Sequence, residues 1–153
     1  MKITLDHFKK FEKQIILKKI GVSGQRKILS SSVLVVGVGG LGCPLITYLA
    51  ASGIGKIGIV DHDKIELSNL NRQTLFGISD LGKLKVEQAK KKINKLNKKI
   101  KITVFKEKLT SKNIKNILKK FDIICDGTDN FYTRYLINDY CQKNKKILIS
   151  GES

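Results

Sequence analysis

The spacing of apolar residues along the chain switches repeatedly between a pattern typical of strands and one typical of helices. Short, nearly continuous apolar runs predict five buried strands, over 32–37, 56–61, 101–105, 121–126 and 145–150. Apolar residues recur every three or four positions, as on one face of a helix, over 5–19, 23–30, 41–52, 82–97, 110–120 and 131–143. Because strands separated by helices are joined by right-handed crossovers, we expect an α/β fold with a doubly wound, mostly parallel sheet and helices on both faces.

The same pattern divides the chain into two parts. Residues 1–31 are predicted to form an N-terminal helical segment, and residues 32–153 a sheet domain long enough to bury a core. The chain stops just after the strand at 145–150, where a doubly wound sheet normally turns into another helix or loop. Two interpretations stay open: this strand ends the domain, or the C-terminal half of the domain is missing. In the second case we expect an exposed apolar edge, with poor solubility or obligate dimerisation.

The chain is strongly basic, with 30 Lys and Arg against 13 Asp and Glu and a formal net charge of +17. Only three of the basic residues are arginines, and the lysines fall between core-spaced apolar residues in "KKINKLNKKIKI" and "NIKNILKK". This arrangement is typical of the solvent face of a helix. Although a basic surface attracts polyanions, we interpret the charge as a solvated surface and expect no nucleic-acid partner.

Several other classes of protein are not favoured. No apolar run approaches the roughly 20 residues of a membrane span, and the first residues lack the apolar core of a secretory signal. The cysteines, Cys43, Cys125 and Cys141, are odd in number and form no CxxC pair. We therefore expect a cytoplasmic protein with no membrane association, in which these thiols pack in the interior rather than form disulfides or bind zinc.

A glycine-rich loop, "VLVVGVGGLGCP", follows the first predicted strand directly and opens a helix. Gly37, Gly39 and Gly42 fit the pattern G-x-G-x-x-G, in which the first glycine permits a tight turn and the second lets a phosphate approach the backbone. The third allows close packing of helix on strand, and the helix N-terminus attracts anions. Asp61 ends the next strand, 24 positions after Gly37, where a carboxylate can accept hydrogen bonds from ribose hydroxyls. The pattern predicts a Rossmann-like nucleotide site, either for a redox dinucleotide or for a nucleotide that is consumed.

A polar loop, "HDKIELSNLNRQTLF", then follows and holds more polar groups than a ribose site needs. Arg72 stands out in it, because the chain otherwise uses lysine almost everywhere. An arginine retained in such a chain suggests a planar, bidentate contact with phosphate. His62, at the start of the loop, is interpreted as incidental because it lacks companions for catalysis.

Two further segments point to the same crevice. Lys85 lies near the start of a predicted helix, where a cation opposes the helix dipole, so an anion is expected to compensate for it. Asp129 and Asn130 lie just beyond the fourth predicted strand, and the carboxyl ends of such strands form the ligand crevice. A carboxylate among phosphates suits Mg²⁺. Tyr132 and Arg134 are expected to belong to the following helix face.

With these residues in place, the chain from about residue 10 onward resembles the MoeB/ThiF/HesA family of ubiquitin-activating-enzyme-like adenylyltransferases. The segments that carry the resemblance, in order, are "VLVVGVGGLGCP", "VDHDKIELSNLNRQTLF", "GKLKVEQA" and "DGTDN". The resemblance implies that ATP and Mg²⁺ are bound and that a ubiquitin-like sulfur-carrier protein ending in Gly-Gly is adenylated at its C-terminal carboxylate, with release of pyrophosphate. It also implies a homodimer and a pathway of the molybdopterin or thiamin type.

The resemblance assigns roles to individual residues. A first group would face the nucleotide phosphates: Gly37, Gly39, Gly40 and Gly42. Asp61 would hold the ribose. A second group would contact the nucleotide along the polar loop and beyond it: Ser68, Asn69, Leu70, Asn71, Arg72 and Lys85. Asp129 would bind Mg²⁺ with Asn130 beside it. Arg72, Lys85 and Asp129 would support the chemistry, together with Lys13, which stands where the family has an arginine that reaches the partner subunit's triphosphate.

Two alternatives stay open at this point. An NAD-dependent oxidoreductase domain fits the glycine loop and Asp61 equally well. A nucleotide-binding fragment without catalysis also fits, because members of the family continue past "ISG" into a segment over the carrier tail and often into paired CxxC zinc ligands. The loss of the bidentate guanidinium at Lys13 favours weaker transition-state support than in the family.

Overall fold

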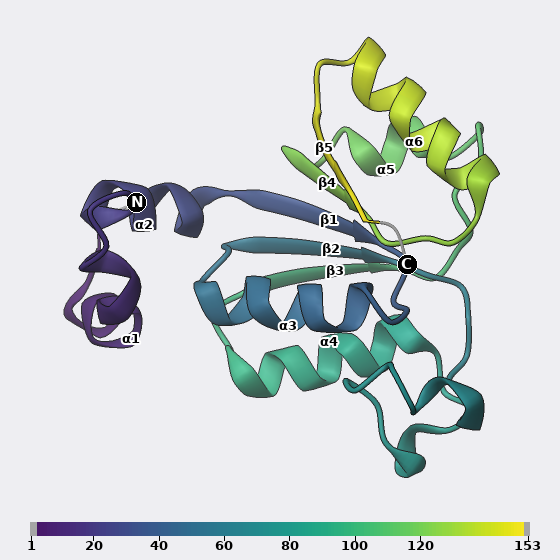
Figure 1. Ribbon diagram of the computed structural model, residues 1–153, viewed down its shortest axis with the longest axis horizontal. Helices are drawn as coiled ribbons and strands as arrows, with labels where there is room; N and C mark the ends of the chain where they lie inside the picture. The colour runs from purple at the N-terminus through teal and green to yellow at the C-terminus, as the bar shows by residue number, and fades with distance from the viewer. Residues whose placement is uncertain (1–2, 152–153) are drawn as a thin grey trace.

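The computed structural model describes residues 3–151, and within them it contains a five-stranded, all-parallel sheet in the order β3-β2-β1-β4-β5 (Figure 1). The strands are β1 (Ser32–Val36), β2 (Lys56–Val60), β3 (Lys101–Phe105), β4 (Ile123–Asp126) and β5 (Ile147–Ser150). The first strand, β1, lies in the middle of the sheet. The chain then adds β2 and β3 on one side of β1 and returns to add β4 and β5 on the other side. This is the Rossmann-like, doubly wound α/β fold that the alternating pattern predicted.

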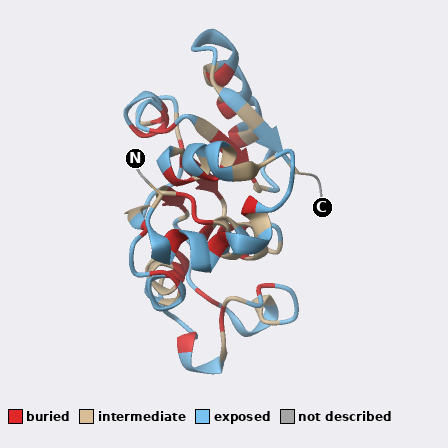
Figure 2. Cartoon of the chain, turned by 90° about the vertical axis from the view of Figure 1, so that its left-hand side faces the viewer, coloured by how far each residue is buried: buried red, intermediate tan, exposed pale blue. Residues whose placement is uncertain are grey.

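Helices cover both faces of the sheet. They are α1 (Leu5–Ile15), α2 (Gly21–Ser30), α3 (Gly42–Ser52), α4 (Lys85–Leu96), α5 (Ile114–Leu118) and α6 (Phe131–Lys143), with short 3-10 turns η1 (Leu67–Asn69) and η2 (Ile78–Asp80). Helices α3 and α4 pack on the face that includes Val33 and Val35, and α5 and α6 on the face that includes Leu34 and Val36. Both faces of β1 are therefore buried, which explains its continuous apolar sequence. Figure 2 shows buried residues gathered in the middle of the molecule.

Some predicted helices are shorter than their apolar spacing suggested. The helix predicted over 5–19 ends at Ile15, and the backbone N–H groups of Ile20 and Gly21 both donate to the Leu17 carbonyl in a turn that starts α2. The helix predicted over 82–97 begins at Lys85, because the preceding residues form an antiparallel bridge with the segment after β2. The helix predicted over 110–120 begins at Ile114, because the Asn113 side chain accepts from the backbone N–H of Thr110 in a turn.

Close packing joins the segment before β4 to the neighbouring strand β2. A Cβ on Gly58 in β2 would overlap the Phe121 ring, so the aromatic ring fills the space that glycine leaves. The Lys56 ammonium lies 4.5 Å from the centre of the same ring and donates to the Lys120 carbonyl at 2.8 Å. The segment that leads into β4 is thereby held to the middle of the sheet.

Helices α1 and α2 lie beside the amino ends of the strands, at the end of the molecule away from the carboxyl ends (Figure 1). Phe11, Ile15 and Leu29 form a small core there. Gly53 ends α3 with φ of 93°, and a Cβ at that position would overlap the Phe11 ring. The contact fixes α1 against the body of the molecule. Within residues 3–151, no helix has the length and apolar character needed to cross a membrane.

Candidate functional site

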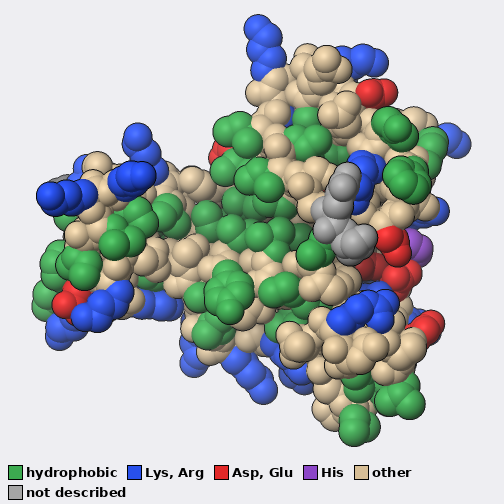
Figure 3. Space-filling view, in the orientation of Figure 1, with side chains coloured by type: hydrophobic (Ala, Val, Ile, Leu, Met, Phe, Trp, Pro, Cys, Tyr) green, Lys and Arg blue, Asp and Glu red, His purple; other side chains and the backbone are tan. Residues whose placement is uncertain are grey.

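A cavity of about 730 Å³ opens at the carboxyl ends of the strands, where ligands bind in doubly wound sheets. Its walls come from the loops that follow β1, β2, β3 and β4. The structure brings together nine of the residues singled out from the sequence: Gly37, Gly39, Gly40, Asp61, Asn69, Arg72, Lys85, Asp129 and Asn130. Figure 3 shows acidic side chains and a histidine gathered beside basic side chains at this end of the molecule.

Five other predicted residues do not line the cavity: Lys13, Gly42, Ser68, Leu70 and Asn71. Lys13 is on α1, its side chain is 85% exposed, and its nearest acid is Glu12 at 3.9 Å. The other four lie directly beside the residues that do line the cavity. Within a single chain, Lys13 therefore has no contact with this site.

The three glycines of the G-x-G-x-x-G pattern after β1 meet different surroundings. Gly37 has a φ of 88°, which favours glycine, and a Cβ on it would lie 3.1 Å from the Gly127 carbonyl oxygen. A Cβ on Gly42 would overlap the Gly37 carbonyl, so glycine is required for α3 to begin this close to β1. A Cβ on Gly39 would have nothing within 4 Å. Gly39 therefore faces the open cavity, where a ligand could approach the backbone.

The backbone N–H groups of Gly39 and Gly40 have no acceptor among residues 3–151. They precede the N-terminus of α3, whose dipole favours negative charge. Free N–H groups at a helix start form a typical site for phosphate or carboxylate. The glycine loop therefore has both the space and the donors that a phosphate requires.

Asp61 links this loop to the segment after β2. One carboxylate oxygen accepts from the backbone N–H of Val38 at 2.7 Å, and the other accepts from the backbone N–H of Asp63 at 2.8 Å. Asp61 therefore fixes the relative position of the two loops while it lines the cavity.

Lys85 is a buried cation at the cavity wall. Its side chain is 7% exposed, its Nζ lies 3.1 Å from an Asp63 carboxylate oxygen, and its backbone N–H donates to the Asp63 carbonyl at 3.0 Å. The anion expected near Lys85 is thus supplied at least in part by the chain itself. The sequence analysis did not assign a role to Asp63, which lies three residues beyond the end of β2. His62 lies 3.5 Å from the same carboxylate.

Arg72 is oriented by its own loop. Its Nη1 donates to the Ser68 carbonyl and to the Asn71 side-chain oxygen, both at 3.1 Å. Its alkyl chain would lie 3.5 Å from a Cβ on Gly40, so the side chain extends over the glycine loop. Ser68 and Asn71 thus hold the arginine in this structure, and their predicted contact with a nucleotide stays a prediction.

The loop after β4 supplies the remaining wall. Asp129 is exposed at the cavity, and the Asn130 side chain accepts from the backbone N–H of Thr133, which caps α6. Two buried polar residues near the cavity were not assigned from the sequence. Asp126, at the end of β4, is 3% exposed and lies behind the cavity wall. Gln73, in the loop after β2, is 3% exposed in the wall itself, and its Oε1 has no hydrogen-bond partner among the described residues.

Oxygen donors suitable for a magnesium ion are present in this cavity. Among the described residues, one group of three could offer ligand atoms to a metal ion: Asp61, His62 and Asp63. One ligand atom from each of them lies within 4.8 Å of the other two. Asp129 does not belong to this group. A magnesium ion on Asp129 would take most of its ligands from phosphate oxygens and water, which is the usual arrangement for this ion.

The three cysteines are buried in the interior and do not line the cavity. Cys43 lies in the first turn of α3, and burial raises the pKa of its thiol to about 11. Burial also raises the pKa of Cys125 and of Cys141. All three thiols pack in the interior, as the sequence analysis expected.

The family model of the ThiF family matches residues 11–153. The chain belongs to the ThiF family. Over 152 residues this ThiF chain is 47% identical to the adenylyltransferase and sulfurtransferase MOCS3 of Culex quinquefasciatus. The aligned region covers 99% of this chain and 35% of that protein. Over 148 residues it is 48% identical to a probable molybdopterin-synthase adenylyltransferase of Porphyra purpurea, with 97% and 39% covered. Over 151 residues it is 40% identical to the sulfur carrier protein adenylyltransferase of Thermus thermophilus, with 99% and 56% covered.

Solved structures show the same fold. The ThiF chain superposes on the E. coli tRNA N6-threonylcarbamoyladenosine dehydratase TcdA with a TM-score of 0.92 and 25% identity, covering 98% of this chain and 62% of that one. It superposes on E. coli MccB with ATP with a TM-score of 0.78 and 31% identity, covering 84% and 38%. The chain spans between about a third and just over half of the length of the curated relatives named above.

Proposed function

We propose that this ThiF-family chain binds ATP in the cavity and transfers the adenylyl group to the C-terminal glycine carboxylate of a ubiquitin-like sulfur-carrier protein, releasing pyrophosphate. The observation that carries the proposal is the open glycine loop, with free N–H groups, in one cavity with Arg72, Lys85 and Asp129. The names of the relatives support the same reaction, because three of them are adenylyltransferases.

The reaction would depend on position and charge. Attack of a carboxylate on the α-phosphorus joins two anions, so the charge of both must be offset at the moment of attack. The glycine-loop N–H groups would hold phosphate oxygens, and Arg72 and Lys85 would offset the negative charge of the triphosphate. Asp61 would accept from the ribose hydroxyls beside its present backbone donors. Since the carrier carboxylate is itself the nucleophile, the reaction needs only that both substrates be held in line.

Asp129 would hold Mg²⁺ with Asn130 beside it. The ion would supply positive charge against the phosphate oxygens. The exposed carboxylate at the cavity rim fits this role.

We further propose a cytoplasmic homodimer in which Lys13 reaches the partner's triphosphate, with residues 32–153 as the nucleotide-binding domain and residues 1–31 as the N-terminal helical segment. Lys13 is highly exposed on α1, and Figure 1 shows α1 at the end of the molecule away from the carboxyl ends of the strands, which is compatible with a role in another subunit. The carrier would belong to a molybdopterin or thiamin type of pathway.

A second candidate is nucleotide binding without catalysis. It is favoured by the glycine loop, whose free N–H groups and open space at Gly39 suffice to hold phosphate without any further group. An NAD-dependent oxidoreductase is less well supported, because Arg72 and Lys85 place two cations at a site where NAD presents only a diphosphate.

Substitution of Gly39 by alanine tests the proposal. Gly39→Ala has room for its methyl group and should leave the fold intact, but the methyl group would occupy the space of the phosphate. We expect ATP affinity, measured by calorimetry, and carrier-dependent ATP–pyrophosphate exchange to fall at least about tenfold. Gly77→Ala is the matched control, because a Cβ on Gly77 also has nothing within 4 Å but lies outside the cavity.

The outcomes separate the candidates. ATP binding with exchange supports adenylyl transfer, and ATP binding without exchange supports the non-catalytic candidate. Protection by NAD with no response to ATP would remove both. If Gly39→Ala binds ATP as tightly as Gly77→Ala, the glycine loop is not the phosphate site.

A further inference from the structure

A buried polar cluster lies behind the cavity, at the carboxyl end of β4. Asp126 is 3% exposed, and one of its carboxylate oxygens accepts from the hydroxyl of Thr128 at 2.7 Å and from its backbone N–H at 3.0 Å. The other oxygen lies 3.4 Å from Nε of Arg134 and accepts from the Ser150 hydroxyl at 3.4 Å. Neither Asp126 nor Arg134 lines the cavity. A carboxylate this deeply buried is stabilised by these donors and by the guanidinium.

Arg134 extends the cluster to a third segment. It lies in α6, and its Nη2 donates to the Thr128 carbonyl and to the Gly151 carbonyl, both at 2.9 Å. Thr128 is therefore held through its backbone N–H, its hydroxyl and its carbonyl. The same guanidinium connects this loop to the residue that follows β5.

The held loop contacts the glycine loop directly. A Cβ on Gly37 would lie 3.1 Å from the Gly127 carbonyl oxygen and 3.2 Å from Cγ2 of Thr128. The Gly127 N–H also donates to the Val36 carbonyl at 2.9 Å. Asp129 is the next residue along, so the position of Thr128 fixes the position of Asp129 relative to the phosphate-binding backbone.

We infer that Asp126 and Arg134 are positioning residues that act through Thr128 to hold Asp129 toward the metal-nucleotide complex, and that they couple this cavity wall to the segment after β5. The inference rests on the proposed ATP site. Asp129, on the cavity side, would contact the ligand, whereas the buried Asp126 contacts only the loop that carries Asp129. Because coupling between two sites is reciprocal, a rearrangement at Gly151 would also change the affinity of the cavity for ATP.

Substitutions at Thr128 test the inference. Thr128→Val keeps the size of the side chain but removes the hydroxyl that donates to Asp126, whereas Thr128→Ser keeps the hydroxyl and removes only the Cγ2 methyl group. Calorimetry with ATP is performed on the full chain with Mg²⁺ and then with a chelator. We expect Thr128→Val to weaken ATP binding in Mg²⁺ about tenfold, as expected for loss of a hydrogen bond to a charged group. Binding in the chelator should change less than about twofold, and Thr128→Ser should behave as the unaltered chain.

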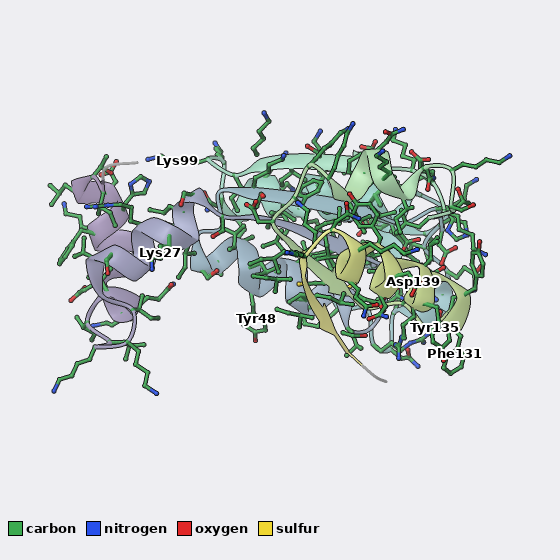
Figure 4. The ribbon with its side chains drawn as sticks, turned by 90° about the horizontal axis from the view of Figure 1, so that it is seen from above. Lys27, Tyr48, Lys99, Phe131, Tyr135 and Asp139 are labelled. Carbon is green, nitrogen blue, oxygen red and sulfur yellow. The ribbon has the colours of Figure 1, made fainter. Side chains whose placement is uncertain are left out.

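A double-mutant cycle distinguishes positioning from a general loss of structure. In an Asp129→Ala background, Thr128→Val should have no further effect on the magnesium dependence, because the carboxylate that it positions is gone. Asp139→Asn is the control, since Asp139 is exposed on the outer face of the same helix as Arg134 (Figure 4). Equal loss of affinity with and without Mg²⁺, or additive effects in the cycle, would overturn the inference.

Hydrogen exchange provides a readout that does not depend on ATP. Thr128→Val should accelerate amide exchange at residues 127–130, with little effect in α3. If the unaltered chain fails to bind ATP, the proposed function is wrong, and exchange still decides whether the cluster holds the loop. Unchanged exchange in Thr128→Val would show that it does not.

Discussion

Lys85 shows most clearly how single residues prepare this cavity. Its side chain is 7% exposed, whereas its partner Asp63 is 52% exposed. The pair therefore lies between the interior and the cavity, with the cation on the dry side. An incoming phosphate would find a cation that is already desolvated and oriented.

Substitution of either partner should separate stability from binding. Asp63→Asn leaves Lys85 buried beside a neutral group, and we expect a loss of about 2 kcal/mol in the free energy of unfolding, measured in urea. Saturating ATP should restore part of this loss, because its phosphates supply negative charge. Lys85→Met should keep most of the stability, since an apolar chain suits a buried site, but should weaken ATP binding at least about tenfold. A Lys85→Met variant with unchanged ATP affinity would contradict the role of this cation.

At this scale the sequence indicated individual cavity residues more readily than the residues that they contact. Arg72, Lys85 and Asp129 could be singled out because rare residue types, helix position and strand ends carry information locally. Asp63 and Asp126 could not be assigned, because their roles depend on contacts with residues 22 and 8 positions away, Lys85 and Arg134. Ser68 and Asn71 were predicted to contact the ligand, and only the structure shows them bonded to Arg72.

At the scale of elements, the turn η2 is tied to helix α4 by one acid. The Lys92 ammonium lies 2.6 Å from an Asp80 carboxylate oxygen, and the same oxygen accepts from the backbone N–H of Gly77 at 3.0 Å. The hydrogen bond from Lys92 is the main cause that lowers the pKa of Asp80. The connection matters because this turn completes the long loop that carries Arg72.

The pH dependence of stability follows from this direction. Since the pKa of Asp80 is lower in the folded chain than its ordinary value of about 4, its contribution is present above that value and is lost as pH falls through the folded pKa. Asp80→Asn should therefore lower stability at pH 7 and flatten the loss of stability on the acid side. Urea unfolding at a series of pH values from 7 to below 4 measures this, with the exposed Asp139→Asn as control. If Asp80→Asn loses stability as steeply as the unaltered chain when pH falls below 4, Asp80 does not cause this pH dependence.

Element types were predictable because strands and helices differ in apolar spacing, and all five strands were found. Element ends were less predictable, since they depend on local bonds that spacing does not reveal. The turn at Asn113 and the bridge before Lys85 both shorten helices whose apolar residues continue beyond the ends.

At the scale of the whole molecule, one sheet face is incompletely covered. Ile147 and Ile149 in β5 are 59% and 57% exposed, and their register places them on the face shared with Val33 and Val35. Tyr48 on α3 is 74% exposed and points outward (Figure 4), and Figure 3 shows apolar side chains in the middle of the view between α3 and β5. Exposed apolar surface of this kind marks contact sites.

We expect the 153-residue chain alone to associate with itself as concentration rises, as the proposed homodimer requires. Analytical ultracentrifugation of the combined Ile147→Lys and Ile149→Lys variant should shift the population toward monomer, because two charges oppose burial of this face. Ile78→Lys is the matched control, because Ile78 is 76% exposed in η2, away from this face. A parent chain that stays monomeric at high concentration would contradict the expectation.

The walls of the cavity come from residues as far apart in the sequence as Val36, at the end of β1, and Thr133, in α6. These walls come together only when the sheet is assembled, so a ligand in the cavity favours the native chain over every partly folded form. Nucleotide added during refolding would therefore raise the yield of native protein by mass action, with the gain growing as the logarithm of its concentration above the dissociation constant.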